Sequence, residues 1–249
     1  MIRLKNDIQI AGIRESCRLL AEMYKNIIPQ VVAGMSTKDI DDLCLEYMQA
    51  HGGKPAWYRE NFPGAACVSV NNEVIHGVPS KKRKIKDGDL VSIDVGIDLN
   101  GYISDSAVTL MIGKVKPEHQ KLVEVTRQCL AAGIEACKVG NRIRDIGAAV
   151  SAVAEAAGYG VVYEYCGHGV GLEVHEDPSV PNVVGRGPNP RIQPGMVLAI
   201  EPMINFGVPE VELAEDGWTV LTADGKFSAH EEHTVAVFRD RTEILTLRD

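Results

Sequence analysis

The chain has 249 residues, of which 45% are hydrophobic and 24% are charged, and its formal net charge is −8. This composition is that of a globular protein, and the acidic balance argues against a broad surface for nucleic acid or anionic lipid. The basic run at 81–84 is better explained as a solvated loop that leads into a strand. No segment has the ~20 consecutive apolar residues of a membrane span, and residues 1–7 lack the apolar stretch of a signal peptide.

The six cysteines form no CxxC pair and no finger-like spacing with histidine. Since nothing else indicates secretion, reduced thiols in a cytoplasmic protein fit best. We therefore expect a cytoplasmic localisation, with no membrane association and no direct function on nucleic acid.

Four helices are predicted, the first two in the N-terminal part of the chain. Apolar residues at helical spacing predict an amphipathic helix over 7–27, with Pro29 just beyond its end. Ser36 or Thr37 can cap a second helix that runs to about His51. A third helix is predicted from near Pro117 to before Gly140, and a fourth from about Ile143 to Ala157.

Strands are predicted where branched residues are bounded by turn formers. These stretches are 66–70, 90–98, 106–112, 197–204 and 234–238. The Pro and Gly cluster at 181–195 predicts an ordered surface loop. No linker or low-complexity segment separates two parts of the chain, so we expect a single catalytic domain over residues 1–249.

One internal similarity relates the two halves of the chain. Residues 85–94 (IKDGDLVSID) resemble residues 192–201 (IQPGMVLAIE), since both contain a Gly-bearing turn, an apolar strand and then one carboxylate. We infer two structurally related halves, which deliver Asp94 and Glu201 to a shared site.

Asp94 lies in an apolar strand, where a carboxylate is costly unless something offsets its desolvation. Asp105 follows eleven residues later, and Asn100-Gly101 between them predicts a hairpin that makes the two acids neighbours. Asp94 alone, like Glu201 alone, is better explained by contact with water or with an arginine, and an acid pair on a hairpin can be two solvated polar positions. Like charges side by side are destabilising, so a bound cation is the better explanation if both point inward.

Histidines and further acids supply the rest of a possible site. Gly167 and Gly169 flank His168 and expose its imidazole, while His175 and His76 lie in loop-like sequence. Each histidine alone is more often an ordinary core or surface residue. Glu231 and Glu232 open the last strand, where alternation turns one of them outward, and the spacing does not say which.

Together these residues form a set of four carboxylates with one or more imidazoles. Oxygen-rich ligation with one nitrogen suits Mn, Fe, Co or Zn and is unlike a thiolate-bound structural zinc. Two bridging acids would hold two metals ~3.5–4 Å apart, an arrangement that aminopeptidases among others use to activate water. Histidines outside the metal shell would steady a substrate or transfer protons.

Seven motifs, taken together, resemble those of the methionine aminopeptidase family over nearly the whole chain. They are Asn-Glu-Val-Ile-His-Gly-Val-Pro (72–79), Ser-Ile-Asp-Val-Gly (92–96), Ser-Asp-Ser-Ala (104–107), Gly-His-Gly-Val-Gly (167–171), His-Glu-Asp-Pro (175–178), Ala-Ile-Glu-Pro (199–202) and Glu-His-Thr (232–234). The resemblance implies the metal ligands Asp94, Asp105, His168, Glu201 and Glu232. Asp105 and Glu232 match the bridging acids, Asp94 would complete one metal, and His168 with Glu201 would complete the other.

The resemblance also implies roles in catalysis and in substrate binding. Glu201 matches the family's proton-transfer acid, and His76 and His175 match histidines that contact the substrate and steady the tetrahedral intermediate. The residues that match the methionine side-chain pocket are Phe62, Cys67 and Trp218. The sequence departs from the family pattern at Val174, where the family often has an aromatic residue, and in the pocket rim at 56–59.

By this resemblance we expect an α/β (α+β) chain with the pita-bread fold. Its two halves would be related by a pseudo-two-fold axis, with a curved antiparallel sheet flanked by helices, as in the short type I form. The implied activity is removal of N-terminal methionine from nascent polypeptides, with a preference for a small second residue. Two divalent ions (Mn, Fe, Co or Zn) would be the cofactors. We expect a monomer, and the resemblance leaves docking at the ribosome open.

Three other functions are compatible with parts of this pattern. Proline-directed peptidases such as aminopeptidase P and prolidase share the fold, but resemble longer chains with an extra N-terminal domain. A binding module that has lost its ligands and a creatinase-like enzyme that needs no metal are both disfavoured, because all five ligand positions are filled.

Overall fold

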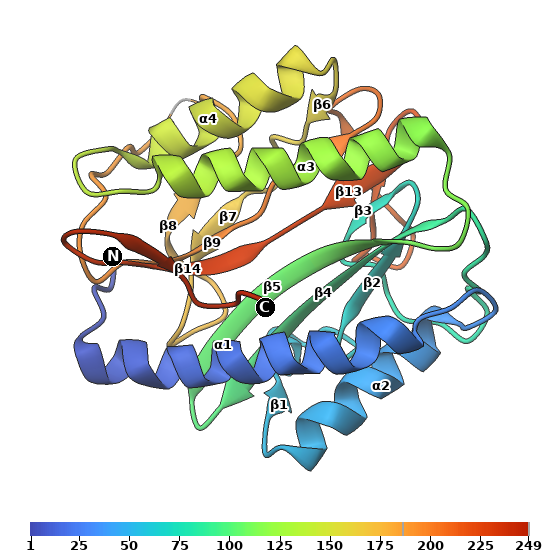
Figure 1. The fold of residues 1–249 in the computed structure, drawn as a ribbon, viewed down its shortest axis with the longest axis horizontal. Helices are drawn as coiled ribbons and strands as arrows, with labels where there is room; N and C mark the ends of the chain where they lie inside the picture. The colour runs from blue at the N-terminus through green and yellow to red at the C-terminus, as the bar shows by residue number, and fades with distance from the viewer. Residues whose placement is uncertain (186, 249) are drawn as a thin grey trace.

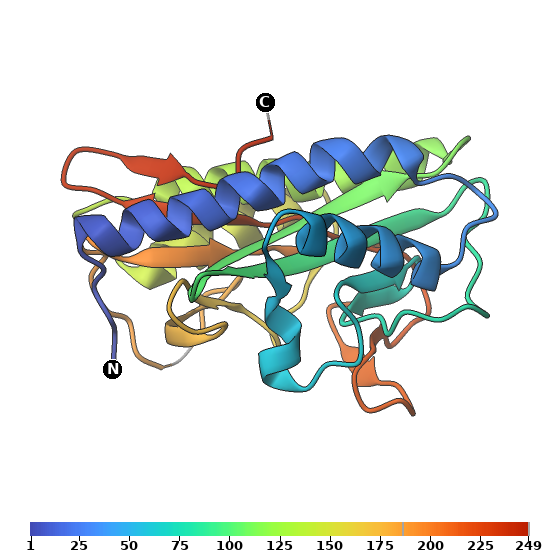
Figure 2. The same ribbon diagram turned by 90° about the horizontal axis from the view of Figure 1, so that it is seen from below.

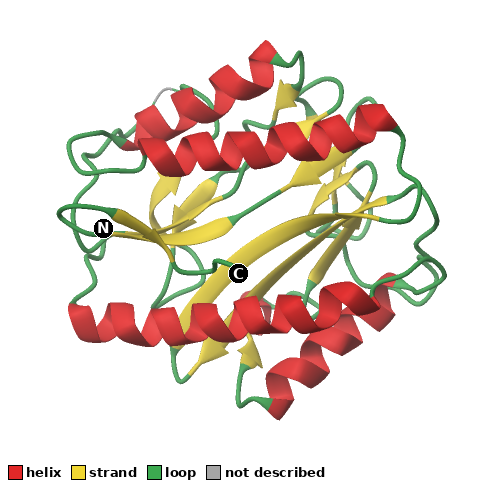
Figure 3. Ribbon diagram, viewed as in Figure 1, coloured by secondary structure: helices red, strands yellow, loops and turns green. Residues whose placement is uncertain are grey.

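The computed structural model describes residues 1–185 and 187–248. Two pairs of helices flank a central set of strands, and the strands run diagonally between the pairs (Figures 1 and 3). Figure 2 shows α1 lying across one side of these strands, while loops project from the other side. None of the helices in the described residues is both long enough and apolar enough for a membrane span.

The first helix pair is fixed by caps that are local in sequence. α1 (Asp7–Ile27) begins after Asn6, whose side chain accepts from the amide of Gln9, and α2 (Thr37–Ala50) begins after Ser36 in the same way. Such caps satisfy amides that have no partner within the helix. Both predicted helices are therefore confirmed. A short 3-10 helix, η1 (Ile28–Gln30), follows α1.

The second helix pair comprises α3 (Pro117–Ala136), which has Pro117 in its first turn, and α4 (Ile143–Ala156). Both predicted helices are confirmed to within a few residues. A second 3-10 helix, η2 (Ala56–Glu60), lies in the first half. The basic run at 81–84 lies outside every helix and strand, as expected of a loop.

In the part of the chain that the structure describes, the strands form four antiparallel sheets. In the first, β4 (Leu90–Leu99) pairs with β1 (Lys54–Pro55), β2 (Cys67–Val70) and β5 (Tyr102–Met111). The largest has the order β15 (Thr242–Ile244), β14 (His233–Val237), β9 (Val197–Ile200), β7 (Gly167–Gly169), β8 (Glu176–Val180). The two small sheets have the orders β13 (Ser228–His230), β10 (Met203–Asn205), β6 (Gly160–Val161) and β11 (Val211–Leu213), β12 (Val220–Thr222), β3 (Glu73–Ile75).

The predicted Asn-Gly hairpin is present. Leu99 pairs with Tyr102, and the two residues between them, Asn100 and Gly101, have φ angles of 55° and 87°. Positive φ at both positions is what a tight hairpin turn requires. The predicted strand at 106–112 therefore starts too late, because pairing begins directly after the turn, at Tyr102.

The predicted strand at 197–204 is wrong as one element. β9 ends at Ile200, and β10 begins at Met203 in a different sheet. Pro202 has no amide hydrogen to donate to a ladder, which favours a break there. As a result, Glu201 lies at the point where the chain leaves one sheet for the other.

The internal similarity between 85–94 and 192–201 corresponds to repeated structure. Gly88 and Gly195 have φ angles of 92° and 91°, a region that favours glycine. The amide of Gly88 donates to Ile112, and that of Gly195 donates to Val237, at 2.7 and 2.9 Å. Each half thus repeats the same turn and strand, in agreement with the predicted pseudo-two-fold arrangement.

The two halves are joined along β5, in part by threonine hydroxyls. Thr109 Oγ1 donates to the carbonyl of His230, and Thr234 Oγ1 donates to the carbonyl of Asp105, both at 2.7 Å. The helices cover this joined layer through apolar clusters, one beneath α1 and α2 and another between β9, β14 and α3. Burial of these clusters is the main force that stabilises the layers.

Candidate metal centre and substrate pocket

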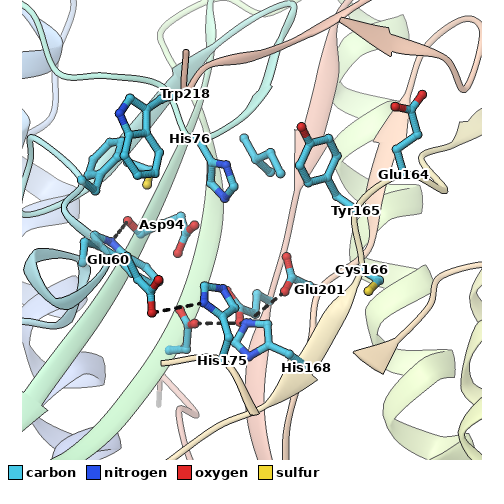
Figure 4. Close-up of a pocket in the computed structure, with 16 residues that line it drawn as sticks. Glu60, His76, Asp94, Glu164, Tyr165, Cys166, His168, His175, Glu201 and Trp218 are labelled. Atoms are coloured by element: carbon cyan, nitrogen blue, oxygen red, sulfur yellow. Dashed lines mark hydrogen bonds and ion pairs between the residues drawn. The ribbon is translucent and has the colours of Figure 1, made fainter. Parts of the chain in front are cut away.

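A cavity of about 340 Å³ lies between the two halves, and sixteen residues line it. All ten residues predicted for the site are among them. They are Phe62, Cys67, His76, Asp94, Asp105, His168, His175, Glu201, Trp218 and Glu232. Figure 4 shows Asp94 and Glu201 on opposite sides of the open space, with His168 and His175 beside one another.

The first two acids are placed by the register of β4 and β5. Asp94 pairs with Ala107, and Asp105 pairs with Gly96, so the two acids are diagonal neighbours. Residues two apart on a strand point to the same face, as do paired residues across a ladder. Both carboxylates therefore face the cavity, where both residues are buried.

The other ligand candidates come from the largest sheet. His168 in β7 pairs with Ala199 in β9, and Ile200 pairs with His233. Glu201 and Glu232 are therefore adjacent to the end of the same ladder. His168 Nε2 lies 3.4 Å from Glu201 Oε1 and 3.6 Å from Asp105 Oδ2.

The structure separates the two consecutive glutamates. Glu232 lines the cavity and has a ligand atom within 4.8 Å of those of Asp105 and His168. Glu231 instead forms an ion pair with Arg127 at 2.9 Å and does not line this cavity. This placement answers the question that strand alternation alone left open.

Burial makes the charged forms of these acids costly. It raises the pKa of Asp94 to about 7 and that of Glu201 to about 8. It also raises the pKa values of Asp105 and Glu232 well above the usual range, and neighbouring carboxylates add to the effect. Asp94 Oδ1, Asp105 Oδ1 and Glu232 Oε1 are buried without a hydrogen-bond partner in the described residues.

His168 is prepared for ligation by its surroundings. Its Nδ1 lies 2.9 Å from the carbonyl oxygen of Gly169. The other ring nitrogen, Nε2, therefore points toward the acids. Burial lowers the pKa of His168 to about 3, so the ring is neutral near pH 7. A neutral imidazole beside several unpartnered carboxylate oxygens fits divalent metal ions.

The other two predicted histidines differ in exposure. Burial lowers the pKa of His76 to about 4, and its backbone has a φ of 56°, which is rare for a residue other than glycine. The His175 side chain is 53% exposed, and its ring centroid lies 4.3 Å from that of His168. His175 Nδ1 also lies 3.7 Å from Glu60 Oε1, at the outer side of the cavity (Figure 4).

One end of the cavity is apolar. Phe62 and Trp218 meet edge to face with centroids 5.4 Å apart, and Cys67 lies with them in one buried cluster. Trp57, from the rim segment that departs from the family pattern, lines the cavity and donates to the carbonyl of Asp94 at 3.3 Å. Val174, the other departure, is 1% exposed and packs in the same cluster.

Several residues near the site were not predicted. The further lining residues are Trp57, Glu60, Ile75, Glu164, Tyr165 and Cys166. Tyr165 and Cys166 directly precede the Gly-His-Gly motif, so their place in the lining could have been predicted from their closeness to His168 in the sequence. His230 is buried outside the lining, with Nε2 3.4 Å from Glu201 Oε2, and stands at the end of β13, two residues before Glu232.

Comparison with known proteins agrees with this geometry. The model of metallopeptidase family M24 matches residues 11–238. The chain belongs to this family. It is 57% identical over 247 residues to a methionine aminopeptidase of Treponema pallidum, covering 99% of this chain and 96% of the relative.

Two solved structures of M24 peptidases are also similar over their full length. A methionine aminopeptidase from Rickettsia prowazekii has a TM-score of 0.96 at 36% identity, with 99% of this chain and 100% of that chain covered. One from Thermotoga maritima has a TM-score of 0.95 at 39% identity, with 99% of each chain covered. The pita-bread fold expected from the sequence is therefore confirmed.

Proposed function

We propose that this chain hydrolyses the peptide bond after an N-terminal methionine, using two divalent ions between its two halves. The observation that supports this proposal most directly is the group of buried carboxylates beside the neutral ring of His168. Three of these carboxylates have an oxygen without a hydrogen-bond partner among the described residues. The full-length similarity to methionine aminopeptidases indicates the same activity. When bound, the ions would supply an activated water and stabilise negative charge on the attacked carbonyl.

The five candidate ligands divide between the halves. Asp105 and Glu232 come from different halves and lie close together, which suits them to bridge two ions. Asp94 would complete one site from β4. His168 and Glu201, 3.4 Å apart, would complete the other. Neither half has all five residues, so we propose one catalytic domain over residues 1–249.

Glu201 is suited to move a proton. In the metal-free protein, burial raises the pKa of this carboxyl to about 8, so Glu201 holds a proton more readily than an exposed glutamate. We assign Glu201 the role of taking a proton from the attacking water and passing it to the leaving amine. His76 is neutral near pH 7, so its ring N–H can donate to the scissile amide or to the intermediate.

The apolar end of the cavity would hold the methionine side chain. Phe62, Cys67 and Trp218 form its wall. Binding in such a pocket is stabilised because it removes the apolar surface of the methionine side chain from water. At the outer side, His175 and Glu60, with Nδ1 and Oε1 3.7 Å apart, would border the residue that follows methionine. This contact supports a preference for a small second residue. We further propose that the chain acts as a monomer on nascent polypeptides in the cytoplasm.

The experiment uses metal-free protein reconstituted separately with Mn, Fe, Co and Zn. Release of free amino acid is measured from Met-Ala-Ser, Met-Leu-Ser and Ala-Ala-Ser. We expect metal-dependent release of methionine from Met-Ala-Ser, slower release from Met-Leu-Ser and little release of alanine from Ala-Ala-Ser. Folded protein that stays inactive with every metal would refute the proposal.

A further inference from the structure

His230 is a buried histidine whose main chain is firmly held. It is 1% exposed and pairs with Met203 across β13 and β10. Its amide donates to Thr109 Oγ1 at 3.0 Å, and its carbonyl accepts from the same hydroxyl at 2.7 Å. These bonds hold the main chain of His230, so the sheet determines the point from which its side chain extends.

The ring itself has no hydrogen-bond partner. Neither Nδ1 nor Nε2 of His230 makes a hydrogen bond within residues 1–185 and 187–248. Buried polar atoms without partners are rare and costly, so an unpartnered ring points to a role that the bonds present do not explain. The nearest acid is Glu201, whose Oε2 lies 3.4 Å from His230 Nε2.

Glu201 stands between two imidazoles. Its Oε1 lies 3.4 Å from His168 Nε2, and its Oε2 lies 3.4 Å from His230 Nε2. The carbonyl of Glu201 is also held, because it accepts from Asn182 Nδ2 at 3.0 Å. His168 lines the cavity, whereas His230 is buried outside the lining. One oxygen of Glu201 therefore faces the metal centre, and the other faces His230.

We propose that His230 is a positioning residue for Glu201. Its Nε2–H would donate to Glu201 Oε2 and so direct Oε1 toward a metal ion that His168 would also hold. This inference rests on the proposed two-metal function and deepens it, because it assigns the group that orients one ligand. Partners of this kind behind ligating residues typically change metal affinity or activity by about 10–100-fold when removed.

The test compares three substitutions of His230 in the full chain. His230→Leu removes the donor, His230→Gln keeps an N–H donor at a similar reach, and His230→Asn carries the same amide one methylene shorter. The Mn²⁺ affinity and stoichiometry of metal-free protein are measured by calorimetry, together with the visible spectrum of the Co²⁺-loaded protein. The kcat and KM for Met-Ala-Ser are measured in parallel.

We expect His230→Leu and His230→Asn to bind one Mn²⁺ about 10–100-fold more weakly and to alter the Co²⁺ spectrum. We expect His230→Gln to recover most of the affinity and of kcat, with KM changed less than kcat. The matched control is His119→Leu, since His119 also has a buried, unpartnered ring nitrogen but packs against Phe227, away from the site. This control should bind Mn²⁺ as the wild type does.

Two results would overturn the role of His230. Wild-type Mn²⁺ affinity and Co²⁺ spectrum in His230→Leu would show that the ring does not orient Glu201. Equal losses in His230→Gln and His230→Leu would show that the N–H donor is not what matters. In both cases the wild type still binds metal and releases methionine, so the proposed function stands. A wild type that does neither would refute the proposed function and this inference with it.

Discussion

The hydroxyl of Ser106 donates a 2.7 Å hydrogen bond to the carbonyl oxygen of Glu232, although the two residues come from different halves of the chain. The amide of Glu232 donates in turn to the carbonyl of Ala107, at 3.0 Å. Ser106 and Ala107 directly follow Asp105 on β5. The two candidate bridging acids are thus positioned by the main-chain contacts that join the halves.

Ser106→Ala should weaken this join. The substitution leaves the Glu232 carbonyl without its hydroxyl donor, and a buried polar group left unpaired costs about 1–3 kcal/mol. We expect a loss of stability of that size in urea unfolding, together with weaker Mn²⁺ binding. Unchanged stability and unchanged Mn²⁺ affinity would show that the hydroxyl does not position Glu232.

Glu201→Gln should stabilise the metal-free protein in a pH-dependent way. Burial raises the pKa of Glu201 from 4.5 to about 8, so the folded state holds its proton more tightly than the unfolded state. The wild type therefore loses this contribution to stability as the pH rises from about 4.5 through about 8, whereas glutamine does not titrate. The thermal midpoint of the variant relative to wild type, measured with a chelator, should rise between pH 5 and pH 8. A constant difference would contradict the assigned shift.

His76→Asn should slow the chemistry and leave metal binding intact. Asparagine tolerates the positive φ of 56° at this position, so the fold should be kept. Loss of a proton-transfer or hydrogen-bonding group should lower kcat by about 10²–10⁴-fold. Metal content is measured on the same samples. A variant that loses bound metal would show that His76 is a ligand, and the proposed division of roles would be wrong.

Lys5→Met should destabilise the fold near the loop that carries His175. Lys5 Nζ lies 2.9 Å from Glu176 Oε2, and the two side chains are 1% and 2% exposed. Removing one partner of a buried ion pair costs about 3–5 kcal/mol, because the other charge stays buried. Urea unfolding measures the loss. Lys25→Met is the control, since its pair with Glu22 is exposed, and equal effects of the two substitutions would contradict the expectation.

The helices and the hairpin were predictable because their signals are local. Ser36 caps its own helix, and Asn100-Gly101 forms its own turn. The choice between Glu231 and Glu232 was not available from alternation, since it depends on Arg127, which is distant in sequence. The role of His230 was missed for the same reason, because only the fold brings it to Glu201. Trp57 lines the cavity because it lies in η2. Long-range contacts such as the ion pair of Arg59 with Asp98 hold η2 in place, so the position of Trp57 could not be read from local sequence.

The most direct test of the central claim counts bound ions and measures turnover in the same samples. Wild-type protein is stripped with a chelator, titrated with Mn²⁺ and assayed for methionine release from Met-Ala-Ser, with bound metal measured at each point. We predict no release without metal, and release that rises with Mn²⁺ bound at the Asp94, Asp105, His168, Glu201 and Glu232 site. Full turnover by stripped protein that holds no metal would contradict the claim.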